Sequence, residues 1–252
     1  MAREQRLAEI FVELADSLVD DFDIIDFLQR LSSLCVELLD VRAAGIMLAD
    51  GQDGLQVVAA SAERTRLLEL FALQHDQGPC AECLRSREPR INIDLTDAET
   101  TAGWPDFAAR ARDAGYTVTH ALPLRLRQRI VGALNLFQPG PHVLGQGDIA
   151  LAQAMADVAT VAILQQRSPE QPHVEHSRVQ TVLTSRVLIE QVKGVLAERW
   201  GTTVDQAFDA LRAQARQDGV GVAELARQII DGSRSTAAIP PPAAPARDGG
   251  PS

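Results

Sequence analysis

The sequence predicts an α+β domain followed by an all-α bundle. Helical and strand-like periods alternate through the first two thirds of the chain, whereas residues 177–231 keep a helical period throughout. Between them the stretch SPEQPH at 168–173 carries two prolines, which is typical of a domain boundary. At 252 residues and 46% apolar content, the chain is long enough for two modest cores.

The first domain is expected to begin with two helices and a hairpin. Residues 4–19 and 24–39 place apolar side chains at helical spacing, separated by the break DDFD. The runs RAAGIMLAD and LQVVAAS then flank the turn-forming cluster DGQDG, which predicts a β-hairpin.

The rest of this domain predicts helices around a central pair of strands. Helical spacing returns over 62–74, a short helix is expected at 80–87, RINI at 90–93 is a candidate edge strand, and WPDFAARARDAG forms another short helix. TVTHALPLRL and IVGALNLF are the most apolar strands and are expected to be central. This order describes an antiparallel sheet with helices on its faces.

The helix expected at 147–166 is apolar on most of its circumference, so it needs cover from two directions. One cover is the sheet, and the other is the same helix of a second copy, which predicts a homodimer. A helix buried within one subunit is the alternative.

Charge and cysteine content limit the class of protein. All of the net charge of −10 lies before residue 171, because residues 171–252 carry nine basic and nine acidic side chains, so any nucleic-acid site must be local. No apolar stretch of membrane-spanning length and no secretory leader is evident, which predicts a cytoplasmic protein without a membrane partner. Three cysteines are too few for a disulfide framework.

The segment IEQVKGVLAERWG contains Lys193, the only lysine in the chain. At 100° per residue, Leu188, Ile189, Val192, Val195 and Leu196 form an apolar stripe, with Arg186, Glu190, Lys193 and Ala197 on the opposite side. With Gly194 beside it, this side is expected to present a flat basic surface to a phosphate backbone. The alternative is a solvated face on which Glu190 and Lys193 pair across one turn.

Two further amphipathic helices complete the expected bundle. Thr203 and Gln206 have capping-box spacing before a helix with an apolar stripe through Phe208 and Leu211. A third helix follows DGVG and ends at Gly232, a C-terminal cap position. The expected boundaries are 1–167 for the first domain, 168–177 for a linker, 178–232 for the bundle, and 233–252 for a disordered tail rich in proline, alanine and glycine.

The bundle resembles the ANTAR domain, an RNA-binding antitermination module of bacterial regulators. The resemblance covers essentially the whole segment 178–232 and rests on SRVLIEQVKGVLAERW and on Ala207, Leu211, Arg212 and Ala226. Val192 and Ala197 depart from the family pattern by apolar exchanges. The resemblance implies binding of paired RNA hairpins in nascent transcripts, which stabilises them against a terminator. The RNA contacts expected on this basis are Arg186, Gln191, Lys193, Arg199, Arg212 and Arg216, and Trp200 is either a base-stacking or a core residue.

Residues 7–166 resemble the GAF domain that is joined to ANTAR modules in actinobacterial regulators. The resemblance rests on stretches such as CVELLDVRAAGIMLAD and WPDFAARARDAGYTVTHALPLRLRQRIVGALNLF. It implies a sensory domain that holds an unidentified small molecule between its sheet and covering helices, or a dimerising scaffold. The candidate ligand or redox residues are Cys80, Cys83, Trp104, Phe107 and His120. The C-x-x-C spacing leaves metal binding, redox sensing and buried thiols open, while His120 is expected to have a structural role.

Together these features predict a signal-responsive antitermination regulator that is not an enzyme. We assign no catalytic residue, no metal site and no particular cofactor. One alternative is a GAF-type methionine sulfoxide reductase that uses Cys80 or Cys83. Another is a DNA-binding transcription factor, although no helix begins with the Arg, Asn and Gln residues expected of a recognition helix.

Overall fold

The computed structural model describes residues 2–16, 23–49, 55–126, 129–140, 143–165 and 175–241. The chain divides into two compact units, residues 1–184 and 185–252. The boundary falls inside helix α7 (Glu175–Trp200), so one helix contributes to both units. The expected linker at 168–177 lies mostly outside the described residues.

The first unit is built on a five-stranded antiparallel sheet with the order β2-β1-β5-β4-β3. Its strands are β1 (Ala43–Ala49), β2 (Leu55–Ala60), β3 (Arg90–Asp94), β4 (Val118–Leu126) and β5 (Arg129–Gln138). The expected hairpins β1–β2 and β4–β5 both form, and β3 is an edge strand as predicted. The two most apolar strands, β4 and β5, lie inside the sheet as expected. Their apolar composition suits a position in which both faces of the strand are covered.

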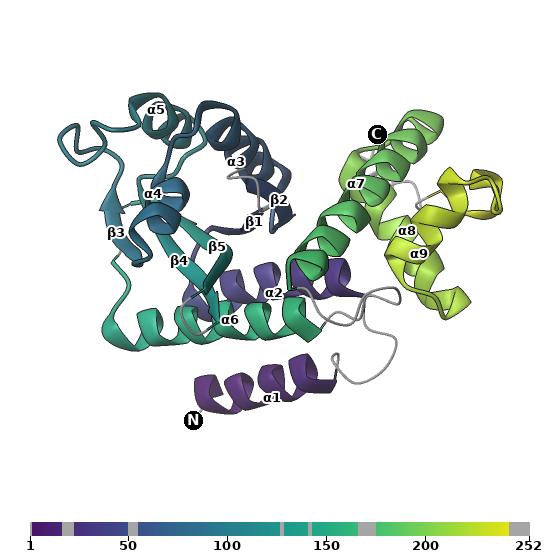
Figure 1. Ribbon diagram of the computed structural model, residues 1–252, viewed down its shortest axis with the longest axis horizontal. Helices are drawn as coiled ribbons and strands as arrows, with labels where there is room; N and C mark the ends of the chain where they lie inside the picture. The colour runs from purple at the N-terminus through teal and green to yellow at the C-terminus, as the bar shows by residue number, and fades with distance from the viewer. Residues whose placement is uncertain are drawn as a thin grey trace, which may run out of the picture. The chain divides into compact units, whose positions relative to one another are not determined.

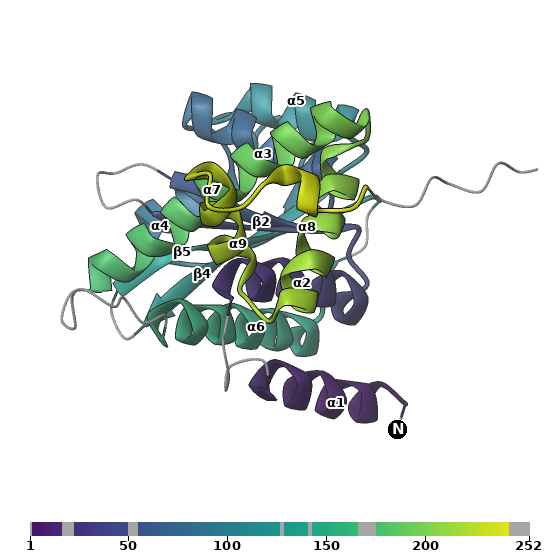
Figure 2. The same ribbon diagram turned by 90° about the vertical axis from the view of Figure 1, so that its right-hand side faces the viewer.

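Helices cover both faces of this sheet (Figure 1). One face carries α3 (Glu63–His75), α4 (Pro79–Ser86) and α5 (Pro105–Asp113). The other carries α2 (Ile24–Leu39) and α6 (Gln146–Gln165), and α1 (Ala2–Asp16) packs outside α2. Figure 2 shows the same layers from the side. The predicted α+β class is confirmed, and each sequence-predicted element is present.

Helix α6 is long and apolar enough to cross a membrane by length and composition alone. It packs against β4, β5 and α2, with Met155, Ala159 and Ile163 fully buried. Its packing against the sheet of its own domain is typical of a core helix. Val161, on its outer side, is 42% exposed.

The second unit contains the end of α7 together with α8 (Val204–Asp218) and α9 (Val222–Ile230). The capping box at the start of α8 is confirmed, since Gln206 N donates to Thr203 Oγ1 and Thr203 N donates to Gln206 Oε1, both at 3.2 Å. Gly232 has a φ of +80°, as a glycine after a helix end requires.

The expectation of a disordered tail is wrong for residues 233–241, which we call the strap. They form a short 3₁₀ helix, Thr236–Ala238, and bury Ile239 to 2% exposure. Arg234 Nη2 lies 2.6 Å from Asp218 Oδ2, and Arg199 Nη1 donates to Thr236 Oγ1 at 2.6 Å. The proline- and alanine-rich composition predicted disorder, but Ile239, Arg234 and Thr236 hold the segment on the bundle.

Candidate functional site

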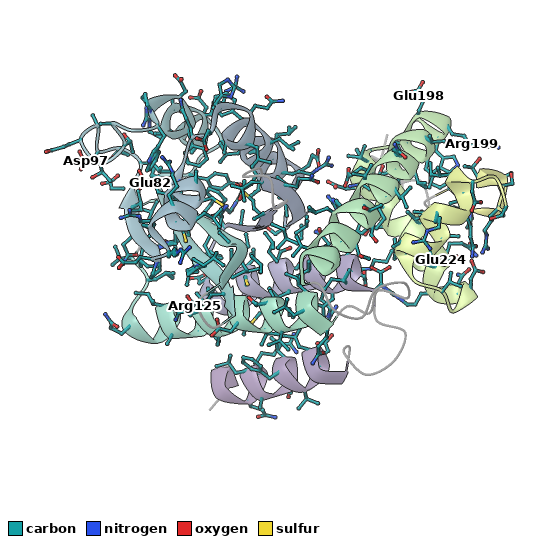
Figure 3. The ribbon with its side chains drawn as sticks, viewed as in Figure 1. Glu82, Asp97, Arg125, Glu198, Arg199 and Glu224 are labelled. Carbon is teal, nitrogen blue, oxygen red and sulfur yellow. The ribbon has the colours of Figure 1, made fainter. Side chains whose placement is uncertain are left out.

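Four of the five predicted sensory residues meet in one packed cluster between the sheet and helices α3, α4 and α5. Cys80, Cys83, Trp104 and Phe107 are each at most 3% exposed there, and Tyr116 and Phe137 belong to the same cluster. Trp104 and Phe107 make an edge-to-face contact with ring centroids 5.6 Å apart. Trp104 Nε1 donates to Glu82 Oε1 at 2.9 Å, which ties the start of α5 to α4 (Figure 3 labels Glu82).

His120 does not join this cluster. Its neighbour Ala121 points into the cluster, so His120 points to the opposite face of the sheet. Its Nδ1 accepts a 2.9 Å hydrogen bond from Asn92 N, and the Asn92 side chain in turn bonds both N and O of Leu144. His120 therefore takes part in a structural anchor between β3, β4 and the segment before α6.

Sequence reasoning missed two polar residues at the centre of the cluster, Glu69 and Asn135. Glu69 on α3 is 1% exposed, and Asn135 on β5 is also 1% exposed. Asn135 Nδ2 donates to Glu69 Oε1 at 2.8 Å and to Oε2 at 3.0 Å. Next to them, Thr65 Oγ1 and Tyr116 Oη lie 3.0 Å apart. We call Glu69 and Asn135 the acid–amide pair.

Burial dominates the electrostatics of this site. It raises the pKa of Glu69 to about 8, against a smaller lowering by the Asn135 hydrogen bond. It also raises the pKa of Cys83 to about 12 and, with the neighbouring Glu69 carboxyl, raises the pKa of Cys80 well above its ordinary value. Both cysteines are free thiols, and these environments oppose formation of the reactive thiolate.

A signal for the acid–amide pair was present in the sequence. Glu69 continues the inward spacing of Thr65, Leu68 and Ala72 along α3, and Asn135 occupies an inward position of an otherwise apolar strand. A carboxyl group on the apolar side of a helix and an amide inside a strand are both costly unless they have a partner.

In the second unit, the expected exposure of the basic surface on α7 is wrong. Lys193 is 3% exposed and Arg186 6% exposed. Arg186 Nη2 and Lys193 Nζ lie 2.5 and 3.1 Å from the same oxygen, Glu190 Oε1. Lys193 Nζ also lies 5.2 Å from the centroid of the Phe208 ring on α8. The alternative of a solvated face with a Glu190–Lys193 pair is confirmed only for the pair, because Lys193 and Arg186 are buried.

The physical reason at Lys193 is that the Phe208 ring of α8 lies over its ammonium group. The buried side of α7 runs through Ser185, Arg186, Ile189, Val192, Lys193, Leu196 and Ala197. Val195, which the helical period places in the apolar stripe, is 51% exposed. Periodicity identified a helix with one apolar side, but two long cations with apolar stems also lie within the buried arc.

The remaining predicted RNA contacts are more exposed than Lys193. Gln191 is exposed and stands 200° around α7 from Lys193, hence on the opposite side. Arg199 is exposed at the end of α7, where Figure 3 labels it beside Glu198. On α8, Arg216 is exposed and Arg212 is half-buried. Trp200 is half-buried.

Comparisons with known proteins identify both units. The sequence profile of the GAF domain matches residues 23–164, and that of the ANTAR domain matches residues 177–230. No curated protein matches the chain.

Several solved structures resemble the first unit. One is the GAF domain of a phosphoenolpyruvate-protein phosphotransferase from Acinetobacter, with 11% identity, a TM-score of 0.49, and 62% of this chain and 92% of that chain covered. Another is a GAF domain/HD domain protein from Geobacter sulfurreducens, with 16% identity, a TM-score of 0.48, and 59% and 97% covered. A type II free methionine-R-sulfoxide reductase from Thermoplasma acidophilum has 14% identity, a TM-score of 0.41, and 56% and 94% covered.

Proposed function

Since the chain belongs to the GAF domain family and carries an ANTAR domain behind its GAF domain, we propose that it is a signal-responsive, cytoplasmic transcription antitermination regulator. In this proposal the ANTAR domain binds paired RNA hairpins in nascent transcripts, and the GAF domain senses a signal. The observation that carries it is helix α7, which continues unbroken from the first compact unit into the second. A change in the first unit is thereby passed along one helix.

We propose that Arg199, Arg212 and Arg216 supply phosphate contacts, and that Gln191 contacts a base from another side of α7. These four side chains are exposed or half-buried. For Arg186 and Lys193, their burial with Glu190 and Phe208 favours a role in positioning α7 against α8 rather than direct contact with RNA.

Within the GAF domain, the environment of the thiols favours a small molecule over a redox signal. Cys80 and Cys83 are buried and have raised pKa values, so both stay protonated at neutral pH. The same facts weigh against the methionine sulfoxide reductase alternative, which needs an accessible thiolate. That enzyme would lose turnover in Cys80→Ser or Cys83→Ser.

The DNA-binding alternative is disfavoured by the starts of α8 and α9. Their first turns contain Asp205 and Glu224, which repel DNA phosphates. We also propose a homodimer. The exposed Val161 on α6 and Val12 on α1, which is 60% exposed, are candidates for its contact surface.

A gel-shift titration at several salt concentrations, with RNA carrying two adjacent hairpins, tests the proposed function. Arg212→Ala combined with Arg216→Ala should weaken binding and reduce the slope of log affinity against log salt by about one for each phosphate that is no longer neutralised. Arg85→Ala on α4 is the control, since it removes the same kind of charge from the other unit. Equal binding by the double variant and the control would contradict these contacts, and failure of the parent chain to bind would contradict the function.

A further inference from the structure

The acid–amide pair occupies a place that the sheet leaves open. Asn135 on β5 lies opposite Gly45 on β1 and Ala121 on β4, so small residues flank it on both sides. The Glu69 carboxyl group fills the space above Gly45, where an added Cβ would lie 2.6 Å from Glu69 Oε1. The sheet is therefore shaped around this carboxyl group.

The hydrogen bonds of the pair leave acceptors in excess. Both Glu69 oxygens accept a hydrogen bond from the same amide nitrogen, Asn135 Nδ2. Asn135 Oδ1 is buried and has no hydrogen-bond partner within the described part of the chain. The amide group thus directs its two N–H donors at the carboxyl oxygens of Glu69, and its own Oδ1 is left without a donor. A hydrogen on the carboxyl group would add the second donor that an acid and an amide need to pair through two hydrogen bonds.

Within the described part of the chain, the groups that face Glu69 supply no compensating cation. From α4 the ionisable neighbour is the thiol of Cys80, which itself lies near Cys83. On α3 the nearest inward polar residue is Thr65, which bonds Tyr116 and carries no charge. β1 and β2 contain no ionisable residue. On α5, Arg110 lies over Phe71 and Arg112 donates to Leu95 O. None of the ion pairs within the described ranges includes Glu69.

We propose that Glu69 and Asn135 form a proton-binding site, in which Glu69 is protonated while the cluster is closed and loses its proton when α3 and its neighbours separate from the sheet. This proposal deepens the proposed function and rests on it, because it assigns a proton as a ligand of the sensory domain.

The direction of the coupling follows from solvation. An ionised carboxylate in an apolar cluster is costly, and contact with water removes that cost. Raising the pH therefore favours the state in which Glu69 reaches water, and that state displaces α3 from β1 and β2. The raised pKa of Glu69, about 8, agrees with this geometry and lies close to neutral pH.

Infrared spectroscopy of the full chain tests the site directly. At pH 6 we expect the carbonyl band of a protonated carboxylic acid, which disappears at pH 9. Labelling with ¹³C-glutamate should shift this band, and because Glu69 is the buried glutamate of the described residues, the shift assigns it without any substitution. Glu69→Gln should remove the band, whereas Glu63→Gln, at the start of the same helix, should leave it. Absence of a glutamic acid band at pH 6, or its persistence in Glu69→Gln, overturns the proposal.

RNA binding then tests the coupling. Between pH 6.5 and 8.5 the affinity of the parent chain for hairpin RNA should change by about fivefold or more, and Glu69→Gln should abolish the difference. A parent chain that binds equally at both pH values, or a Glu69→Gln variant that keeps the dependence, overturns the coupling. If neither protein binds RNA at any pH while the infrared band titrates, the proposed function fails and the proton site stands.

Discussion

The first unit holds a buried glutamate, Glu69, and the second a half-buried one, Glu190, and the two acids have different partners. In the first unit Glu69 contacts a neutral amide and lies among thiols and aromatic rings. In the second, Glu190 lies between two cations, Arg186 and Lys193, that share one of its oxygens. Burial beside a neutral partner raises the pKa of Glu69, whereas two neighbouring cations offset the charge of Glu190.

We therefore expect the site of Glu69 to respond to pH, and the cluster around Glu190 to stabilise the packing of α7. The proton on Glu69 can leave, so the stability of its surroundings depends on pH. The cluster of Arg186, Glu190 and Lys193 links two turns of α7 and, through Phe208, links α7 to α8. Breaking it leaves charges in a poorly solvated place.

Substituting glutamine for Glu69 should produce the largest effect, confined to high pH. The pKa of Glu69 rises from 4.5 in the unfolded chain to about 8 in the fold, so between these values the unfolded chain has lost a proton that the fold retains. Its contribution to stability is thus complete below pH 4.5 and falls by about 1.4 kcal/mol per pH unit up to about pH 8, or about 4–5 kcal/mol in all. Urea unfolding monitored by Trp104 fluorescence in a Trp200→Phe background should show Glu69→Gln matching the parent at pH 5 and exceeding it at pH 8.5. If the stabilities of the parent and of Glu69→Gln changed with pH in the same way, Glu69 would not be the group that titrates.

Truncating Ile239 to alanine should cost about 3 kcal/mol in the second unit, as expected for removing a buried isoleucine side chain. The bundle is small, so one buried residue outside its three helices matters. Unfolding monitored by Trp200 fluorescence should report the loss, whereas Ala237→Ser, an exposed change in the same strap, should leave stability unchanged. Equal stability of the two variants would show that the strap is dispensable.

Glu190→Gln should destabilise the second unit by about 2–3 kcal/mol, in contrast to the same substitution at Glu69. The loss is smaller than for a fully buried pair because the Glu190 side chain is 24% exposed. Glu198→Gln, near the exposed end of the same helix, is the matched control. Thermal unfolding followed by circular dichroism measures the stability of both variants. A neutral or stabilising effect of Glu190→Gln would contradict the stabilising role of this acid.

The smallest expected effect is that of Gly45→Ala, about 1 kcal/mol, since the added methyl group displaces the Glu69 carboxyl group from Asn135. The loss should be absent from Gly147→Ala, because a Cβ at Gly147 meets nothing within 4 Å. Chemical unfolding of both variants measures this. An unchanged Gly45→Ala variant would mean that the carboxyl group does not depend on the space above Gly45.

The positions of most elements were predictable because they follow from local periodicity. The 2-residue and 3.6-residue periods placed each strand and helix, and the spacing of Thr203 and Gln206 marked a helix start that the side chains confirm. The candidate sites were predicted less well. Cys80, Cys83, Trp104 and Phe107 do meet, whereas His120 faces away, because the register of β4 places alternate residues on opposite faces.

The burial of Lys193 could not be predicted from the helical period of the sequence. The helix around it was apparent from the sequence, and its pairing with Glu190 was the alternative to the exposed surface that we expected. The arc of the helix that becomes buried depends on where α8 packs, and the Phe208 ring lies on the side of the ammonium group. A lysine with a long apolar stem, a nearby acid and an aromatic ring can be buried at limited cost, and a hydropathy pattern does not register that.

By itself the sequence determined the order of helices and strands, the two-domain division and the family of each domain, since these depend on the local period and on residues close together in the chain. Tertiary structure alone decided which polar groups meet. Glu69 and Asn135 are 66 residues apart, and Arg199 finds Thr236 37 residues further along. Contacts at that separation depend on how the sheet and helices close over one another, so the site that we assign to a proton exists only in the folded chain.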